Sequence, residues 1–134
     1  MSLTFAPCVL IPCYNHGAMM AGVLTRLQPF GLPCIVVDDG SDTATREALA
    51  SLAAEHSHLT LIRLPENAGK GAAVIAGLQA AAKAGFSHAV QVDADGQHAI
   101  EDIPALLALS QKHPDALISG QPIYDDSIPR SRLY

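Results

Sequence analysis

The sequence predicts an α/β fold with three layers, in which helices cover both faces of a mostly parallel sheet. Short apolar runs rich in β-branched residues alternate with helix-like stretches, and the connections between them are short, a pattern typical of parallel sheets with right-handed crossovers. Loops rich in Asp, Asn, Gly and Lys follow the carboxyl ends of the apolar runs. Because ligands bind outside the carboxyl ends of strands in open sheets, we expect an enzyme whose site lies where these loops meet.

The apolar patterns and turn residues place the individual elements. Strands are expected at residues 5–12, 34–37, 59–64 and 89–92, with a short fifth strand at 116–120. Helices are expected at 19–27, at 43–55, from about residue 71 to 84, and at 101–113. Ser41, Asp42 or Thr43 is available as the N-cap of the second helix, Gly85 follows the third, and Pro104 lies in the first turn of the fourth. The polar tail at 121–134 predicts no element.

Composition narrows the class of protein. The chain has 134 residues, enough for one domain or part of a larger one, and 49% of them are hydrophobic. Net charge is −5 with no cluster of Lys or Arg, which argues against a nucleic-acid partner. Cys8, Cys13 and Cys34 form no C-x-x-C pair and no signal peptide is visible, so we expect a reduced, cytoplasmic setting. No apolar run approaches the ~20 residues that cross a bilayer, so this chain is expected to be soluble.

The fourth expected strand ends in two carboxylates, Asp93 and Asp95, followed by glycine. Strand alternation points both to the same side, and two such oxygen ligands suit Mg²⁺ or Mn²⁺, which fill the rest of their shell with water and phosphate. Gln97 and His98 are further candidate ligands. A polar turn is the simplest alternative. An EF-hand register is poor because its first ligand would be Gln91 within an apolar strand. The similar motif of haloacid-dehalogenase phosphatases lies on a first strand, not a late one.

The second expected strand also ends in paired carboxylates, Asp38 and Asp39, before a glycine. One interpretation is a capped turn in which Asp39 or Ser41 holds helix N–H groups. Asp38, at the very end of the strand, can instead accept a hydrogen bond from a nucleobase N–H.

Two further loops contribute candidates. Residues 67–71 match neither a Walker A loop nor a dinucleotide fingerprint, but Lys70 between two glycines at a helix start would attract an anion. The alternative is a solvated loop lysine. Pro12 and Tyr14 lie at the end of the first expected strand, where a rigid proline and an aromatic ring could support a nucleobase. The alternative is that Tyr14 packs in the core. Cys13 has no visible base partner, so a thiol nucleophile is not expected.

Four segments together, residues 11–15, 36–41, 67–73 and 92–98, resemble the motifs of family 2 glycosyltransferases in order and spacing. Within that family, the Asn-x-Gly-Lys-Gly and Asp-Ala-Asp-Gly-Gln-His segments are most similar to the dolichol- or polyprenyl-phosphate mannosyl/glucosyltransferase branch. The resemblance covers about residues 9–120. It implies the GT-A fold, a Rossmann-like fold that binds nucleotide-diphosphate sugars.

The resemblance also implies roles for individual residues. Asp93 and Asp95 match the DxD motif that holds the metal and the diphosphate, and Gln97 matches a further metal ligand of some members. The residues implied in nucleotide binding are Pro12, Tyr14, Asp38, Lys70 and Ala94. The implied cofactor is Mg²⁺ or Mn²⁺.

The implied reaction is metal-dependent, inverting transfer of a sugar from a UDP- or GDP-sugar to an acceptor such as a polyprenyl phosphate, a glycan or a lipid. The metal offsets the charge on the departing diphosphate. A phosphate acceptor is already ionised, whereas a hydroxyl acceptor needs a base.

Two departures from the family pattern bear on this expectation. His16 stands where the branch usually has Glu, and the acceptor half would lie at or beyond Tyr134, with Arg130 and Arg132 at its start. We therefore expect residues 1–134 to be the donor-binding, N-terminal part of a longer glycosyltransferase, located in the cytoplasm or at the cytoplasmic face of a membrane.

Two other functions stay open. One is a nucleotide-sugar-binding module, non-catalytic or incomplete. The other is a nucleotidyltransferase, which would need a Gly-rich loop with a basic residue after the first strand, and residues 14–17 lack it.

Overall fold

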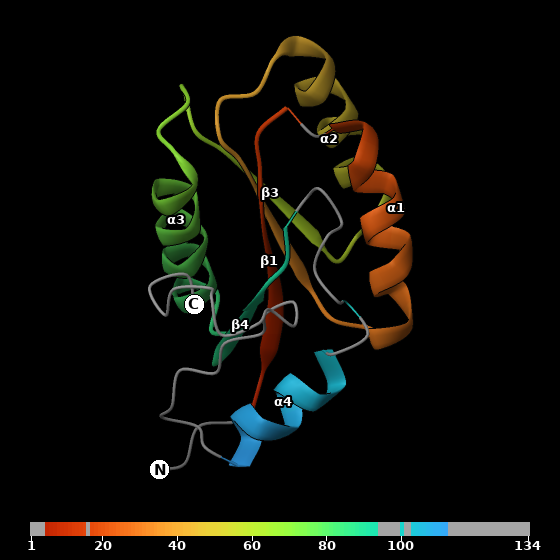
Figure 1. Cartoon of the computed structure of the whole chain (residues 1–134), viewed down its shortest axis with the longest axis vertical. Coiled ribbons are helices and arrows are strands. Elements are labelled where there is room, and N and C mark those ends of the chain that lie inside the picture. Colours follow the sequence, from red (N-terminus) through yellow and green to blue (C-terminus); the bar gives the residue numbers. More distant parts are fainter. Residues whose placement is uncertain (1–4, 16, 94–99, 101–102, 113–134) are drawn as a thin grey trace, which may run out of the picture.

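The computed structural model describes residues 5–15, 17–93, 100 and 103–112, which form one α/β unit (Figure 1). Its elements in chain order are β1 (Pro7–Cys13), α1 (Gly17–Leu27), the 3₁₀ turn η1 (Gln28–Phe30), β2 (Cys34–Asp38), α2 (Thr43–Glu55), β3 (Leu59–Arg63), α3 (Lys70–Lys83), β4 (His88–Gln91) and α4 (Ile103–Lys112).

The four strands form one parallel sheet in the order β3-β2-β1-β4. Val9 pairs with Cys34 and Cys13 with Asp38, while Pro7 pairs with His88 on the other side of β1. The strand order reverses between β1 and β4, and at such a switch point a crevice opens outside the carboxyl ends of the strands. The predicted parallel sheet is thus confirmed, and the described ends of the four strands, with the loops after β2 and β3, share one rim.

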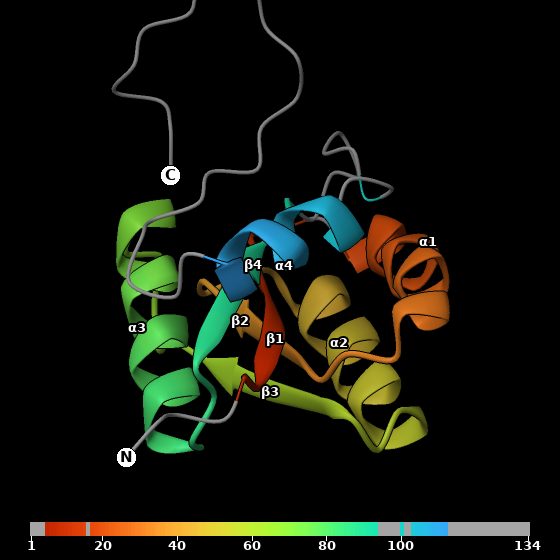
Figure 2. The ribbon, with the colours of Figure 1, turned by 90° about the horizontal axis from the view of Figure 1, so that it is seen from below.

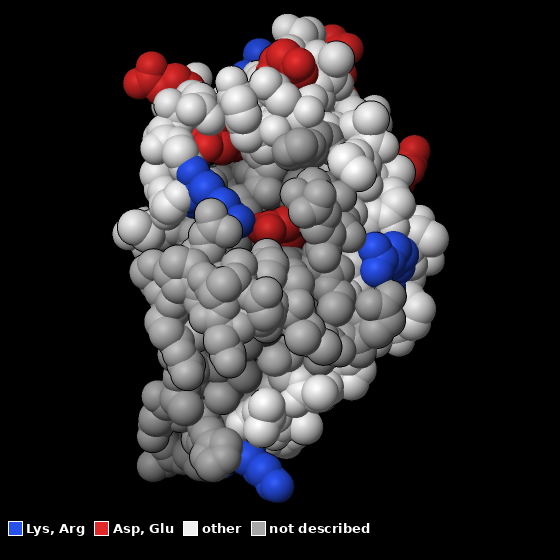
Figure 3. All heavy atoms as spheres, in the orientation of Figure 1, with Lys and Arg blue, Asp and Glu red and all other residues white. Residues whose placement is uncertain are grey.

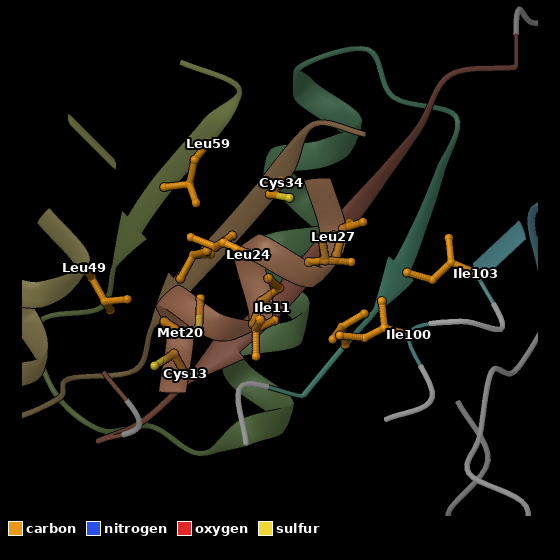
Figure 4. Close-up of a cluster of buried hydrophobic side chains, with 14 residues drawn as sticks. Ile11, Cys13, Met20, Leu24, Leu27, Cys34, Leu49, Leu59, Ile100 and Ile103 are labelled. Carbon is orange, nitrogen blue, oxygen red and sulfur yellow. The ribbon is translucent and has the colours of Figure 1, made fainter. Parts of the chain in front are cut away.

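Helices cover both faces of the sheet, as the sequence predicts. Figure 2 shows α1 and α2 on one face and α3 on the other. Alternation along each strand supplies the two cores: Val9 and Ile11 face α1 and α2, whereas Cys8 and Leu10 face α3. The larger core also takes in Ile103 of α4 (Figure 4). Leu107 of the same helix is partly buried against this core.

Local chemistry explains where the helices begin and end. Asp42 is the N-cap of α2 and accepts a hydrogen bond from Thr45 N at 2.9 Å. After α3, Gly85 has φ +92°, and the amides of Gly85 and Phe86 donate to the carbonyls of Ala82 and Ala81. This pair of bonds is a Schellman motif, which satisfies carbonyl groups at the helix end.

The observed bounds differ from the expected ones mainly at element ends. Helix α1 begins two residues earlier than expected, α3 begins at Lys70, and η1 was not expected. The expected strand at 116–120 and the tail at 121–134 lie outside the described residues, as do the outer ends of the expected helix at 101–113. Within the described part of the chain, no helix is long and apolar enough to cross a membrane.

Candidate functional site

Two carboxylates, Asp38 and Asp39, lie at the rim of the sheet where β2 ends. Backbone pairing continues to this point, because Asp39 N donates to Cys13 O at 2.9 Å and Leu64 N to Asp38 O at 2.8 Å. Val36 lies in the core under α1 and α2 and Val37 in the core under α3. Alternation therefore sends Asp38 toward the first face and Asp39 toward the face of α3.

Asp38 stabilises its own turn. Its side chain is 1% exposed, and Oδ1 accepts a hydrogen bond from Ser41 N at 2.9 Å. The predicted contact of Asp38 with a nucleobase stays a prediction.

Asp39 holds a different segment, the loop between β3 and α3. The residue is 3% exposed, and its carboxylate accepts hydrogen bonds from Ala68 N at 2.8 Å, from Gly69 N at 3.0 Å and from Asn67 Nδ2 at 3.0 Å. The interpretation that Asp39 or Ser41 accepts hydrogen bonds from the first N–H groups of α2 is wrong, because the side chain of Asp42 caps that helix. Asn67 was not identified from the sequence as a partner of Asp39. The signal in the sequence for such a role was that Asn67 lies just before the start of a helix.

The exit of β1 is tied to the exit of β2. Asn15, with φ 57°, donates its backbone N–H to Ser41 Oγ at 3.0 Å, and Asn15 Oδ1 accepts from Asp42 N at 2.8 Å. Pro12 is buried and paired with Val37. Tyr14 is 46% exposed, so the core-packing alternative for its ring is wrong, and the aromatic face is accessible beside the rim.

Lys70 and Asp93 form an ion pair at the rim of the sheet. Lys70 Nζ lies 2.8 Å from Asp93 Oδ1, with the lysine side chain 45% exposed and the aspartate 24%. In Figure 3 a basic and an acidic patch adjoin beside α3. Val92 N still pairs with Leu10 O at 2.9 Å, so Asp93 is fixed where β4 pairing ends. The alternative of a merely solvated Lys70 is wrong, and two predicted site residues are brought together.

Of the three cysteines, Cys8 and Cys34 lie within the sheet, whereas Cys13 ends β1 beside Asp38. Cys8, Cys13 and Cys34 are all buried, and none of them forms a disulfide. Burial raises the pKa of the Cys8 thiol from 9.0 to about 11, and burial together with the nearby Cys8 does the same for the pKa of Cys34. Because the thiolate is the nucleophile, neither group supports nucleophilic catalysis at neutral pH.

Comparison with known proteins identifies the family. Residues 8–133 match the model of Glycosyl transferase family 2. The chain belongs to this family. It is 33% identical to a UDP-N-acetylglucosamine–dolichyl-phosphate N-acetylglucosaminyltransferase of Methanococcus voltae, over 89% of this chain and 47% of that protein. It is 34% identical to the polyprenol monophosphomannose synthase of Mycolicibacterium smegmatis, over 84% and 44%.

A solved structure agrees with the fold of this family 2 chain. The mannosyltransferase PcManGT of Pyrobaculum calidifontis, in complex with GDP-Man and Mn²⁺, matches with a TM-score of 0.57 and 24% identity, over 78% of this chain and 33% of that one. This likeness supports the predicted GT-A fold. The chain spans less than half the length of the curated relatives it matches.

The divalent cation implied by the family fits the residues that the structure describes. Asp93 offers a partly exposed carboxylate at the rim, and its charge is already met by a cation, the Lys70 ammonium. Among the described residues, no three His, Cys, Asp or Glu side chains are grouped to hold a metal. Mg²⁺ sites with one or two carboxylates are completed by water and phosphate. The other predicted residues here, Ala94, Asp95, Gln97 and His98, lie outside the described residues.

Proposed function

We propose that this family 2 domain binds the donor of a metal-dependent, inverting glycosyltransferase that moves a sugar from a UDP- or GDP-sugar to a polyprenyl phosphate. The observation that carries the proposal is the pairing of Lys70 with Asp93 at the switch point of the sheet, with Lys70 Nζ 2.8 Å from the carboxylate. A carboxylate for a metal and an ammonium for a diphosphate are thereby placed side by side.

The diphosphate of the donor would lie at the start of α3. The first α-helical bond of this region runs from Ala73 N to Gly69 O, so the amides of Gly71 and Ala72 have no acceptor within the helix. These amides and the helix dipole favour an anion, and Lys70 adds a full positive charge. A half-exposed ion pair contributes only ~0–1 kcal/mol, so a diphosphate can compete with Asp93 for Lys70.

The nucleoside would lie over the exits of β1 and β2. Tyr14 presents an exposed ring there, and aromatic rings bind the flat face of a base well. Pro12 fixes the backbone that leads to this ring. Asp38 is kept as the proposed acceptor of a base N–H.

When bound, Mg²⁺ or Mn²⁺ would offset the charge that develops on the departing diphosphate. Asp93, with the predicted Asp95 and Gln97, would hold it, while Lys70 would orient the phosphates. A phosphate acceptor is ionised at neutral pH and needs no strong base. The names of the relatives support this class of acceptor, since two are a dolichyl-phosphate transferase and a polyprenol monophosphomannose synthase. A lipid acceptor would bring the whole protein to the cytoplasmic face of a membrane.

Melting of the chain with UDP-, GDP-, CDP- and ADP-sugars, with and without Mn²⁺, tests the donor site. A ligand at ~100 times its dissociation constant adds ~2.7 kcal/mol to the free energy of unfolding. We expect a Mn²⁺-dependent rise in Tm with one nucleotide class, reduced by Asp93→Asn and by Lys70→Met. Asp42→Asn, at the N-cap of α2, is the matched control. A rise of equal size in all four proteins would contradict the proposed site.

A second candidate function is a donor-binding module without turnover of its own. Sugar transfer by the isolated chain to a polyprenyl phosphate would exclude this candidate. Donor binding without transfer would favour it.

A further inference from the structure

We propose that Asp39 is a positioning residue, which acts through the loop at 66–69 to hold Lys70 against Asp93. The effect of Asp39 on nucleotide binding rests on the proposed donor site. Asp39 itself would contact neither the diphosphate nor the metal. It would set where the ammonium of Lys70 stands before the donor arrives.

The hydrogen bonds of Asp39 reach across the sequence to this loop. Oδ1 accepts from Ala68 N, and Oδ2 accepts from both Gly69 N and Asn67 Nδ2, at 2.8 to 3.0 Å. The side-chain nitrogen of Asn67, Nδ2, also donates a hydrogen bond to Asp39 O at 3.2 Å. Both carboxylate oxygens are therefore engaged, and the side chain is 3% exposed. A buried carboxylate is stable only when such donors surround it.

The next residue shows how closely the two loops approach. Gly40 has φ +67°, and a Cβ at this position would collide with Asn67 N and with the carbonyl carbon of Glu66. The turn after β2 and the loop after β3 are thus in backbone contact. The loop at 66–69 is held by hydrogen bonds to Asp39 and packs against Gly40.

Lys70 follows this loop directly. Gly69 has φ +100°, a conformation that glycine adopts readily and leaves readily. Asp39 fixes the amide of Gly69 itself, so it fixes the direction in which the chain enters α3 at Lys70. The ion pair with Asp93 is half exposed on the lysine side, and such pairs contribute too little to hold a flexible lysine by themselves. The backbone anchor is the stronger constraint on its position.

Two ligand-free NMR measurements test this arrangement. Hydrogen exchange of the Ala68 and Gly69 amides should be at least ~10-fold faster in Asp39→Asn, since one oxygen acceptor becomes an NH₂ donor facing other donors. The order parameter of the Lys70 ε-methylene should fall in Asp39→Asn about as far as in Asp93→Asn. The matched control is Asp42→Asn, which alters another helix-capping carboxylate on the same rim and should change neither value. If Asp39→Asn does not fold, both measurements are made on Asn67→Ala, which removes the two hydrogen bonds from the Asn67 side chain to Asp39.

A double-mutant cycle tests whether Asp39 acts through Lys70. We expect Asp39→Asn to weaken binding of GDP or UDP with Mn²⁺ about tenfold in the wild-type background, and less than twofold in a Lys70→Met background, because coupled residues are not additive. Equal losses in both backgrounds would overturn the proposal, as would unchanged exchange and order in Asp39→Asn. If the wild-type chain binds no nucleotide, the proposed function fails, and the two NMR measurements still decide the role of Asp39.

Discussion

Asp38 and Asp39 are neighbours in sequence with separate structural roles, because the alternation of β2 sends them to opposite faces. Asp38 holds Ser41 in its own turn, and Asp39 holds the loop before α3. Glycine at position 40 is what allows the two loops to touch. The paired carboxylates thus connect the loop after β2 with the loop after β3. A substitution at Gly40 is expected to disturb both loops together.

The first prediction concerns Gly40. Gly40→Ala should lower the free energy of unfolding by about 2–4 kcal/mol, from a left-handed φ together with overpacking against the loop at 66–69. Gly31→Ala is the control, because Gly31 has φ +62° but open space where a Cβ would lie; it should cost about 1 kcal/mol. Urea denaturation of both variants measures the difference. Equal losses would mean that the backbone contact at Gly40 carries no energy.

Lys70 gives a second prediction at the residue scale. Without nucleotide, Lys70→Met should bind Mn²⁺ about 30-fold more tightly than wild type, since repulsion between a unit charge and a divalent ion ~4 Å apart is worth ~2 kcal/mol in water. Titration calorimetry with MnCl₂ alone measures this. Lys83→Met, at the other end of α3, is the control and should leave Mn²⁺ affinity unchanged. Equal Mn²⁺ affinities for wild type and Lys70→Met would show that Lys70 does not lie close to the metal site.

At the scale of elements, α3 packs closely on the sheet because it is built from small residues. Gly77 faces Leu10 of β1, and a Cβ on Gly77 would collide with the end of the Leu10 side chain. Gly77→Ala should therefore lower the free energy of unfolding by ~1–2 kcal/mol, as overpacking exceeds the gain in helix propensity.

Gly22 is the matched control for this prediction. It lies in α1, is exposed, and has no atom within 4 Å of a Cβ position. Gly22→Ala should raise the free energy of unfolding by ~0.5–1 kcal/mol through helix propensity alone. Thermal melts of both variants should move in opposite directions. A stabilised Gly77→Ala would show that Leu10 moves aside at little cost.

The elements were predictable from sequence because their signals are local. The pattern of apolar residues predicted the positions of β1 to β4. The start of α2 was predicted from three candidate N-cap residues, and one of them, Asp42, is the N-cap. Alternation alone also implies that Asp38 and Asp39 face apart. The partners of Asp39 were not predictable, because Asn67, Ala68 and Gly69 lie 28 to 30 residues away. Their approach depends on strand order and on how each loop closes, which a single sequence does not specify.

At the scale of the whole molecule, site and core are separate parts of one sheet. The rim carries Asp39, Lys70 and Asp93, while the thiols of Cys8 and Cys34 are buried within the sheet, with exposed fractions of 0% and 1%. Ligand chemistry and the pH dependence of folding should therefore be separable by mutation. The rim variants change binding, and the thiol variants change how stability responds to alkaline pH.

The last prediction follows from those thiols. Their pKa values rise from 9.0 to about 11 in the folded chain. Above pH 9 the unfolded chain therefore loses thiol protons that the folded chain keeps, so the free energy of unfolding falls as pH rises toward 11, by at most ~1.4 kcal/mol per pH unit for each thiol. The double variant Cys8→Ala/Cys34→Ala should show a flatter decline in urea midpoints between pH 9 and 11. Val9→Ala truncates a buried neighbour without removing a titrating group, so its curve should run parallel to that of wild type. A double variant that also runs parallel would show that the two thiols ionise in the folded chain as readily as in the unfolded one.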